Sequence, residues 1–88
     1  MGELTKLSNI GEKLEHQLND VGITTCEELK QTGSREAWLR ILARDPSACL
    51  MRLSALEGAI QGVRWHYLDE KTKESLKAFY HQHKGIRL

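Results

Sequence analysis

The sequence predicts an all-α fold, a compact bundle of about five helices. Apolar residues recur at intervals of three and four along successive segments, which is the spacing of one helix face. Residues that typically begin and end helices stand between these segments, and no segment shows the alternation typical of a strand. With 88 residues, of which 40% are hydrophobic, the chain is expected to form one small domain over residues 1–88.

The N-terminal part predicts a short helix around residues 3–8 and a longer one of about residues 11–20. The apolar face of the longer helix is formed by Leu14, Leu18 and Val21. Its outward face is expected to hold Glu12, Glu15, His16 and Asn19. Gly22 is expected to end this helix, because glycine readily adopts the left-handed conformation of a helix C-terminus.

N-cap residues predict the next two helices. Thr24 and Thr25 each precede a glutamate by three residues, so either can form a capping box for a short helix that ends before Gly33. Ser34 is expected to cap the following helix. The inward residues of that helix are Trp38, Ile41 and Leu42.

Asp45 and Pro46 predict the start of a helix of about residues 46–62, since aspartate is a favoured N-cap and proline fits the first helical position. An apolar seam along it is formed by Cys49, Leu53, Leu56, Ile60 and Val63. A second stripe is made of small residues, namely Ala48, Ala55, Gly58, Ala59 and Gly62. We therefore expect a central helix covered on two sides, with Gly58 and Ala59 at a close helix–helix contact.

The last predicted helix, of about residues 69–84, turns Thr72, Leu76, Phe79 and Tyr80 inward. Across the whole chain, the expected core comprises Leu14, Leu18, Trp38, Leu53, Leu56, Ile60, Leu76 and Phe79.

Several function classes are disfavoured. No apolar run reaches the length of a membrane span, and no signal peptide is recognised. Cys26 and Cys49 form no CxxC pair and are read as buried reduced thiols, which indicates the cytoplasm. His81 and His83 diverge on a helix, and no nucleophile, base or metal set lies in evident mutual reach. We expect no catalytic, cofactor or metal site and no membrane partner.

The net charge of +1 argues against strong binding of polyanions. Residues 1–34 carry three basic and six acidic side chains, whereas the remainder carries ten basic and six acidic ones. Electrostatic support for a nucleic acid would therefore come mainly from arginines of the second half, if they share a face. These are Arg35, Arg40, Arg44, Arg52 and Arg64.

Residues 4–29 resemble a helix-hairpin-helix motif, with an apolar pattern on both sides of Asn9, Ile10 and Gly11. In DNA-binding examples the hairpin reads Gly-hydrophobic-Gly, and amides at the second helix's N-terminus hold a phosphate with a nearby lysine. Gly11 and Lys13 match, while Asn9 stands at the first glycine position, where asparagine tolerates positive φ. The resemblance implies DNA contact at Asn9, Ile10, Gly11 and Lys13. The alternative is a hairpin that only joins two helices.

A longer resemblance covers nearly the whole chain. The segments ARDPSACL (residues 43–50), LSALEGAIQGVRWHYL (residues 53–68) and residues 76–80 resemble the C-terminal domain of the TfoX (Sxy) competence-regulator family. This resemblance implies an all-α bacterial domain that usually follows an N-terminal α/β domain, in proteins that act as transcriptional co-regulators of DNA-uptake genes. The chain has no room for that first domain, so we expect a standalone version or an excised fragment.

The sequence thus predicts a non-enzymatic regulatory module that contacts the DNA phosphate backbone weakly. The alternative is a protein-interaction or oligomerisation module with a purely structural hairpin, motivated by Leu50, Met51 and the acidity of the hairpin half. The charge and exposure of the surface around residues 9–13 would discriminate between them.

Overall fold

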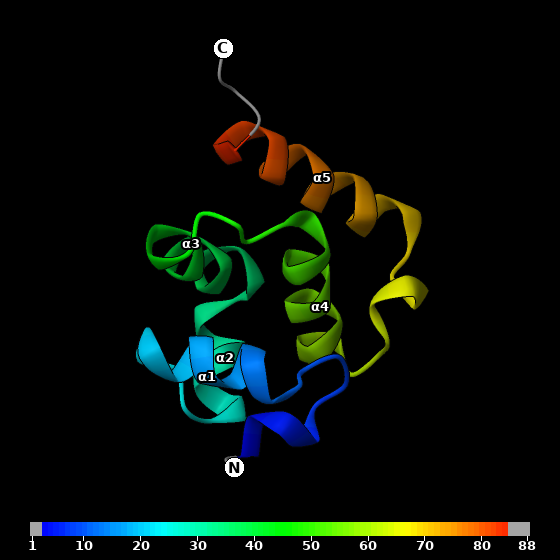
Figure 1. Cartoon of the computed structure of the whole chain (residues 1–88). Coiled ribbons are helices and arrows are strands. Elements are labelled where there is room, and N and C mark those ends of the chain that lie inside the picture. The colour runs from blue at the N-terminus through cyan, green and yellow to red at the C-terminus, as the bar shows by residue number, and fades with distance from the viewer. Residues whose placement is uncertain (1–2, 85–88) are drawn as a thin grey trace.

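Seven helical elements follow one another along residues 3–84, the part of the chain that the structure, a computed structural model, describes (Figure 1). The α-helices are α1 (Glu12–Asp20), α2 (Cys26–Thr32), α3 (Ser34–Arg44), α4 (Leu50–Gln61) and α5 (Glu70–Lys84). Two short 3-10 helices, η1 (Glu3–Lys6) and η2 (Trp65–Tyr67), complete the set. No strand occurs in this range, so the all-α prediction is confirmed.

Helix α4 is the centre of the molecule, because α2, α3, α5 and η2 all pack against it. Figure 1 shows α5 crossing the end of the bundle where α4 begins, while α1, α2 and η1 lie toward the other end. Six of the eight expected core residues are buried: Leu14, Leu18, Trp38, Leu53, Leu56 and Leu76. Ile60 and Phe79 are only partly buried and pack at the edge of this core.

Local signals fix several helix ends as expected. The Ile23 N–H donates to the Leu18 carbonyl at 2.9 Å and the Gly22 N–H to the Asn19 carbonyl at 3.1 Å. With Gly22 at φ +89°, this is the Schellman arrangement that satisfies the last carbonyls of a helix. Of the two candidate caps for α2, the structure selects Thr25, which forms the capping box with Glu28.

The expected cap of α3 is wrong. Gly33 occupies the N-cap position, and Ser34 lies inside the first turn, where it is buried. Its hydroxyl donates to Glu57 Oε1 on α4 at 2.6 Å, so this serine ties α3 to α4 and does not cap its own helix. A hydrogen bond from a hydroxyl to an ionised carboxylate is stronger than one between neutral groups, which favours this contact between the helices.

Helix α4 begins at Leu50, four residues after the predicted start. Asp45 folds a local turn instead, because its Oδ1 accepts both the Ser47 N–H (3.0 Å) and the Ser47 hydroxyl (2.6 Å). Such side-chain turns compete with helix formation. Cys49 consequently becomes the N-cap of α4 and is exposed, and Cys26 is half-buried, so the prediction of buried thiols is wrong.

Glu15 was expected on the outward face of α1, and this is also wrong, since the residue is only 5% exposed. Helix α1 packs against both η1 and α3, so its buried face is wider than a single stripe. In the part of the chain that the structure describes, no helix has the length and apolarity needed to cross a membrane.

Candidate nucleic-acid interface

Asn9, the residue at the tip of the hairpin, has φ +71° and points its side chain into the molecule. Its Nδ2 donates to the Val63 carbonyl at 2.9 Å and lies 3.5 Å from the Ala55 carbonyl. Its Oδ1 accepts the Trp65 N–H at 3.1 Å. The positive φ agrees with the expectation for asparagine at this position. The amide group is engaged by segments 46 to 56 residues away and therefore positions the hairpin.

Gly58 supplies the space for this contact. A Cβ atom added at Gly58 would lie 2.6 Å from Asn9 Nδ2, 2.8 Å from the Val63 carbonyl oxygen and 3.2 Å from the Trp65 Cα. The expected close approach at Gly58 therefore exists. Its partners are the hairpin and the connection into η2, however, and not a second α-helix as predicted. Ala59 is buried beside it.

The other three predicted DNA-contact residues differ in how accessible their side chains and backbone are to a ligand. Ile10 is 4% exposed and belongs to the core, so its side chain anchors the hairpin and is not available to a ligand. Gly11 is the exposed N-cap of α1, and no side chain caps this helix end. A Cβ at Gly11 would meet nothing within 4 Å, which leaves open backbone at a helix N-terminus. Lys13 is exposed in the first turn of α1.

A cavity of about 500 Å³ opens beside the hairpin, between α1, the start of α4 and η2. Its lining residues are Asn9, Gly11, Lys13, Leu14, Gln17, Cys49, Met51, Arg52, Ala55, Arg64 and Trp65. Three of them, Lys13, Arg52 and Arg64, are cationic, and the lining contains no Asp or Glu. The acidic half of the sequence thus contributes a lysine to a basic cavity, although Glu12 is exposed nearby on α1. This arrangement can attract an anion.

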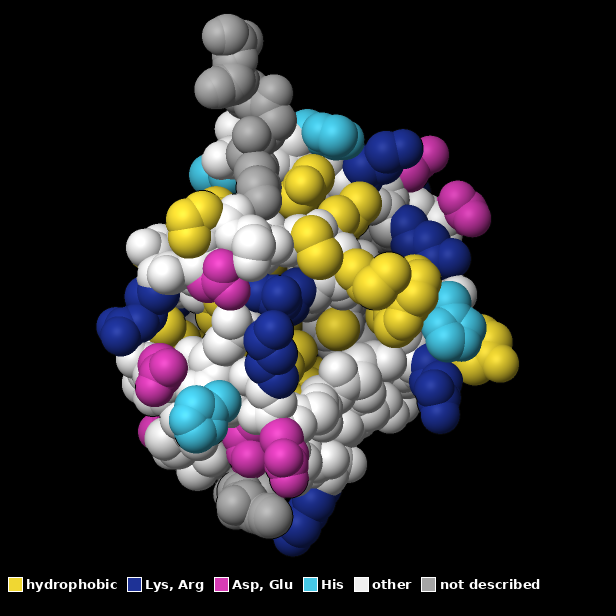
Figure 2. All heavy atoms as spheres, in the orientation of Figure 1, with side chains coloured by type: hydrophobic (Ala, Val, Ile, Leu, Met, Phe, Trp, Pro, Cys, Tyr) yellow, Lys and Arg dark blue, Asp and Glu magenta, His cyan; other side chains and the backbone are white. Residues whose placement is uncertain are grey.

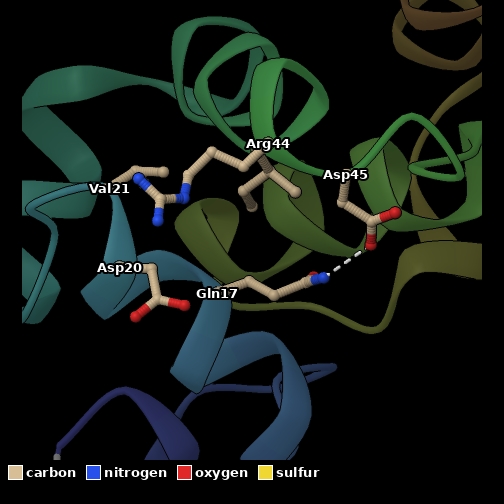
Figure 3. A pocket seen from close by; sticks show the side chains of 6 residues that line it. Gln17, Asp20, Val21, Arg44 and Asp45 are labelled. Carbon is tan, nitrogen blue, oxygen red and sulfur yellow. Dashed lines mark hydrogen bonds between the residues drawn. The ribbon is translucent and has the colours of Figure 1, made fainter.

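Asp45 holds Arg52 at the edge of this cavity, through an ion pair of 3.2 Å between Nη1 and Oδ2. The same Oδ2 accepts Gln17 Nε2 from α1 at 2.8 Å, as Figure 3 shows. Hydrogen bonds from the Ser47 hydroxyl and N–H, and then from Gln17 and Arg52, keep the pKa of Asp45 well below its ordinary value. Asp45 is therefore ionised at neutral pH, and it positions Arg52 while neutralising part of its charge.

The five arginines expected to support nucleic-acid binding reach different places. Arg40 pairs with Glu36 on its own helix at 3.2 Å. Arg35 donates to Ser75 of α5 at 2.7 Å, and Arg44 lines the separate cavity of about 290 Å³ in Figure 3, which also holds two carboxylates. Only the remaining two, Arg52 and Arg64, line the hairpin cavity. The basic composition of the second half indicated such support, but which arginines supply it depends on the fold.

Comparison with known protein families shows to which family this chain belongs. The model of the TfoX C-terminal domain matches residues 1–80. The chain belongs to the TfoX C-terminal domain family. The resemblance predicted from the sequence is thus confirmed, and membership indicates a competence-related regulatory module of a type not known for catalysis.

Two crystal structures from Listeria monocytogenes are similar to this TfoX C-terminal domain. An uncharacterized protein in a triclinic form has a TM-score of 0.93 and 50% identity, over 97% of this chain and 97% of that chain. A protein of unknown function in a tetragonal form has a TM-score of 0.88 and 53% identity, over 90% of this chain and 96% of that chain. No protein of curated function matches the sequence significantly.

In this TfoX C-terminal domain, the segment that carried the family resemblance is the segment that receives Asn9. Ala55, Gly58, Val63 and Trp65 all belong to ALEGAIQGVRW, and each provides an atom close to the Asn9 side chain. Of these four, only Gly58 is required for its residue type, because Ala55, Val63 and Trp65 contribute backbone atoms to the contact. Elsewhere among residues 3–84, no group of three or more His, Cys, Asp or Glu side chains is placed to hold a metal ion.

Replacing Asn9 should loosen the hairpin. Asn9→Ala removes both hydrogen bonds at the Val63 carbonyl and the Trp65 N–H and places alanine at positive φ, so we expect a loss of about 2 kcal/mol in the free energy of unfolding. Asn9→Gly removes the same bonds without the backbone strain and should cost about 1 kcal/mol. Urea unfolding followed by far-UV circular dichroism measures both. Equal stability of wild type and Asn9→Ala would contradict the positioning role.

Proposed function

We propose that this domain is a non-enzymatic regulatory module that binds DNA weakly, by holding backbone phosphates at the hairpin cavity. The observation that supports this most directly is the lining of that cavity, which includes Lys13, Arg52 and Arg64 and no Asp or Glu. Phosphate contacts from Lys and Arg provide most of the sequence-independent affinity for DNA.

Each part of the hairpin has a role in this proposal. The exposed N-terminus of α1 at Gly11 presents backbone N–H groups and the positive end of the helix dipole to a phosphate. Lys13 adds a positive charge in the same turn, while Asn9 and Ile10 fix the hairpin against the core. These are positioning contacts with the DNA backbone, so they carry no sequence information.

The affinity should be low, and three features limit it. Arg52 shares its charge with Asp45, Glu12 lies exposed in the first turn of α1, and the net charge of the chain is only +1. We expect a dissociation constant for duplex DNA of about 10⁻⁴ M or poorer at physiological salt, with a salt dependence of about one to three phosphates. Useful affinity in a regulatory complex would then require further contacts from a partner or a second subunit.

Lys13→Glu should abolish this binding and leave the fold intact, because Lys13 is exposed and its replacement reverses a charge at the phosphate site. Fluorescence anisotropy with a labelled DNA duplex at low salt is the measurement. Lys30→Glu is the matched control, since Lys30 is also an exposed lysine, lies on α2 and does not line the cavity. It carries the same change in net charge and should reduce binding only slightly.

Two results would overturn the proposal. One is tight, sequence-specific binding by the domain alone. The other is weak binding that survives Lys13→Glu but disappears when Arg40 and Arg44 are replaced by glutamate, because these two residues lie outside the hairpin cavity.

A further inference from the structure

A second cavity, of about 450 Å³, lies between the start of α4, η2 and α5. Its lining residues are Leu50, Met51, Ser54, Trp65, Lys73 and Lys77. Hydrophobic side chains gather between α5 and η2 in Figure 2, with Lys or Arg side chains at the edges of this patch. Met51 is 58% exposed, which is high for a large apolar side chain beside a cavity.

The lining of this cavity has an apolar and a basic part. Leu50, Met51 and Trp65 form the apolar part, here called the floor, and Lys73 and Lys77 of α5 form the basic part, here called the rim. Lys73 Nζ donates to the His66 carbonyl at 3.2 Å, which joins α5 to η2 across one wall. The lining contains no Asp or Glu, and the exposed carboxylates of α5, Glu70 and Glu74, lie outside it.

We propose that this groove docks an acidic amphipathic helix of a partner protein. Apolar anchors of such a helix, at intervals of three and four, fit an apolar floor, and its flanking carboxylates complement Lys73 and Lys77. A methionine in the floor adapts to different anchor side chains because the thioether chain is unbranched and flexible.

The composition of the floor favours a protein partner over a nucleic acid. Bases of single-stranded nucleic acid stack on aromatic faces, whereas two of the three apolar residues here are aliphatic. The third, Trp65, is half-buried, and His66 lies edge-on against it with ring centroids 5.1 Å apart. Leucine and phenylalanine side chains match this surface better than stacked bases do.

The groove adjoins the hairpin cavity, because Met51 and Trp65 line both. A docked helix that extends past these residues would bring its carboxylates toward Arg64. The two sites can nevertheless be tested separately, since Lys77 lines only the groove and Lys13 only the hairpin cavity. This inference therefore stands whether or not the hairpin binds phosphate.

The probe is a fluorescein-labelled amphipathic peptide of about 14 residues, with leucine at every third or fourth position and glutamate elsewhere. Anisotropy titrations should show saturable binding to the wild-type chain. Lys77→Glu and Met51→Glu should each weaken it about tenfold, because they repel the peptide from the rim and the floor. Both side chains are exposed, so both variants are expected to fold.

Matched controls distinguish binding at the groove from general effects of surface charge and hydrophobicity on peptide binding. Lys71→Glu changes another exposed lysine of α5. Tyr67→Glu changes a second large exposed apolar residue of the described range, which is 73% exposed. Neither residue lines the cavity. Both should bind the peptide within about twofold of wild type. A peptide with lysine in place of every glutamate should not bind.

Three outcomes would overturn the proposal. The first is that the acidic peptide fails to bind the wild-type chain. The second is that it binds the two groove variants as tightly as the controls. The third is that Lys77→Glu and Met51→Glu abolish binding of single-stranded oligothymidylate but leave peptide binding unchanged, which would assign the groove to nucleic acid. Loss of duplex binding in Lys13→Glu with peptide binding retained would support both sites.

Discussion

Leu56→Ala should lower the free energy of unfolding by about 2–5 kcal/mol. Leu56 is fully buried in α4, the helix against which α2, α3, α5 and η2 pack. Truncation removes buried apolar surface and leaves a cavity at the junction of these elements, where the rigid neighbours can collapse only partly.

Equilibrium urea unfolding, followed by far-UV circular dichroism, measures this loss. Met51→Ala is the control on the same helix, because Met51 is mainly exposed and its truncation should cost less than about 0.5 kcal/mol. If Leu56→Ala lost no more than this control, α4 would not be the central helix of the domain.

Gly58→Leu should destabilise the fold by about 3 kcal/mol or more, because overpacking is added to the loss of the Asn9 hydrogen bonds. The new Cβ alone would stand 2.8 Å from the Val63 carbonyl oxygen and 2.6 Å from Asn9 Nδ2. The Val63 oxygen is backbone and cannot move aside cheaply. The hairpin and the η2 connection must therefore shift together.

Gly58→Ala gives the sharper measurement. In an exposed helix this change would stabilise by about 1 kcal/mol through helix propensity, whereas here it should destabilise. Removing the Asn9 side chain relieves part of the clash, so Gly58→Ala should cost less in an Asn9→Gly background than in the wild type. Additive effects of the two substitutions would show that Gly58 and Asn9 do not share one contact. Gly11→Ala is the glycine control, with nothing within 4 Å of its Cβ.

Much of the fold follows from signals that act within one helical turn. The Schellman end at Gly22 depends only on neighbouring residues, and Gly22 was the predicted end of this helix. The capping box of Thr25 and Glu28 is equally local, although the sequence left Thr24 and Thr25 as alternatives and the structure selects Thr25. Asp69 similarly accepts the Thr72 N–H at 2.8 Å at the start of α5. The 3.6-residue periodicity placed Leu53 and Leu56 inside, since a helix buries one face whatever its partner is.

The wrong predictions have more than one cause. Ser34 bonds to Glu57 across the α3–α4 contact, a partner that the local pattern does not contain. Asp45 instead folds a local turn with Ser47, which competes with the predicted helix start, and Gln17 and Arg52 then bond to its other carboxylate oxygen. Glu15 is buried because two elements meet α1.

The candidate site likewise has some features that local sequence signals determine and others that only the tertiary structure determines. The sequence by itself determined a hairpin with Asn9 at its tip, Gly11 at the start of α1 and Lys13 exposed beside it, because turn and cap preferences are local. Only the tertiary structure decided that Asn9 points inward onto Val63 and Trp65, and that Arg52 and Arg64 join Lys13 around one cavity. These residues are distant in the chain, and their meeting depends on how α4 and η2 pack against the hairpin, a long-range arrangement that no local periodicity encodes.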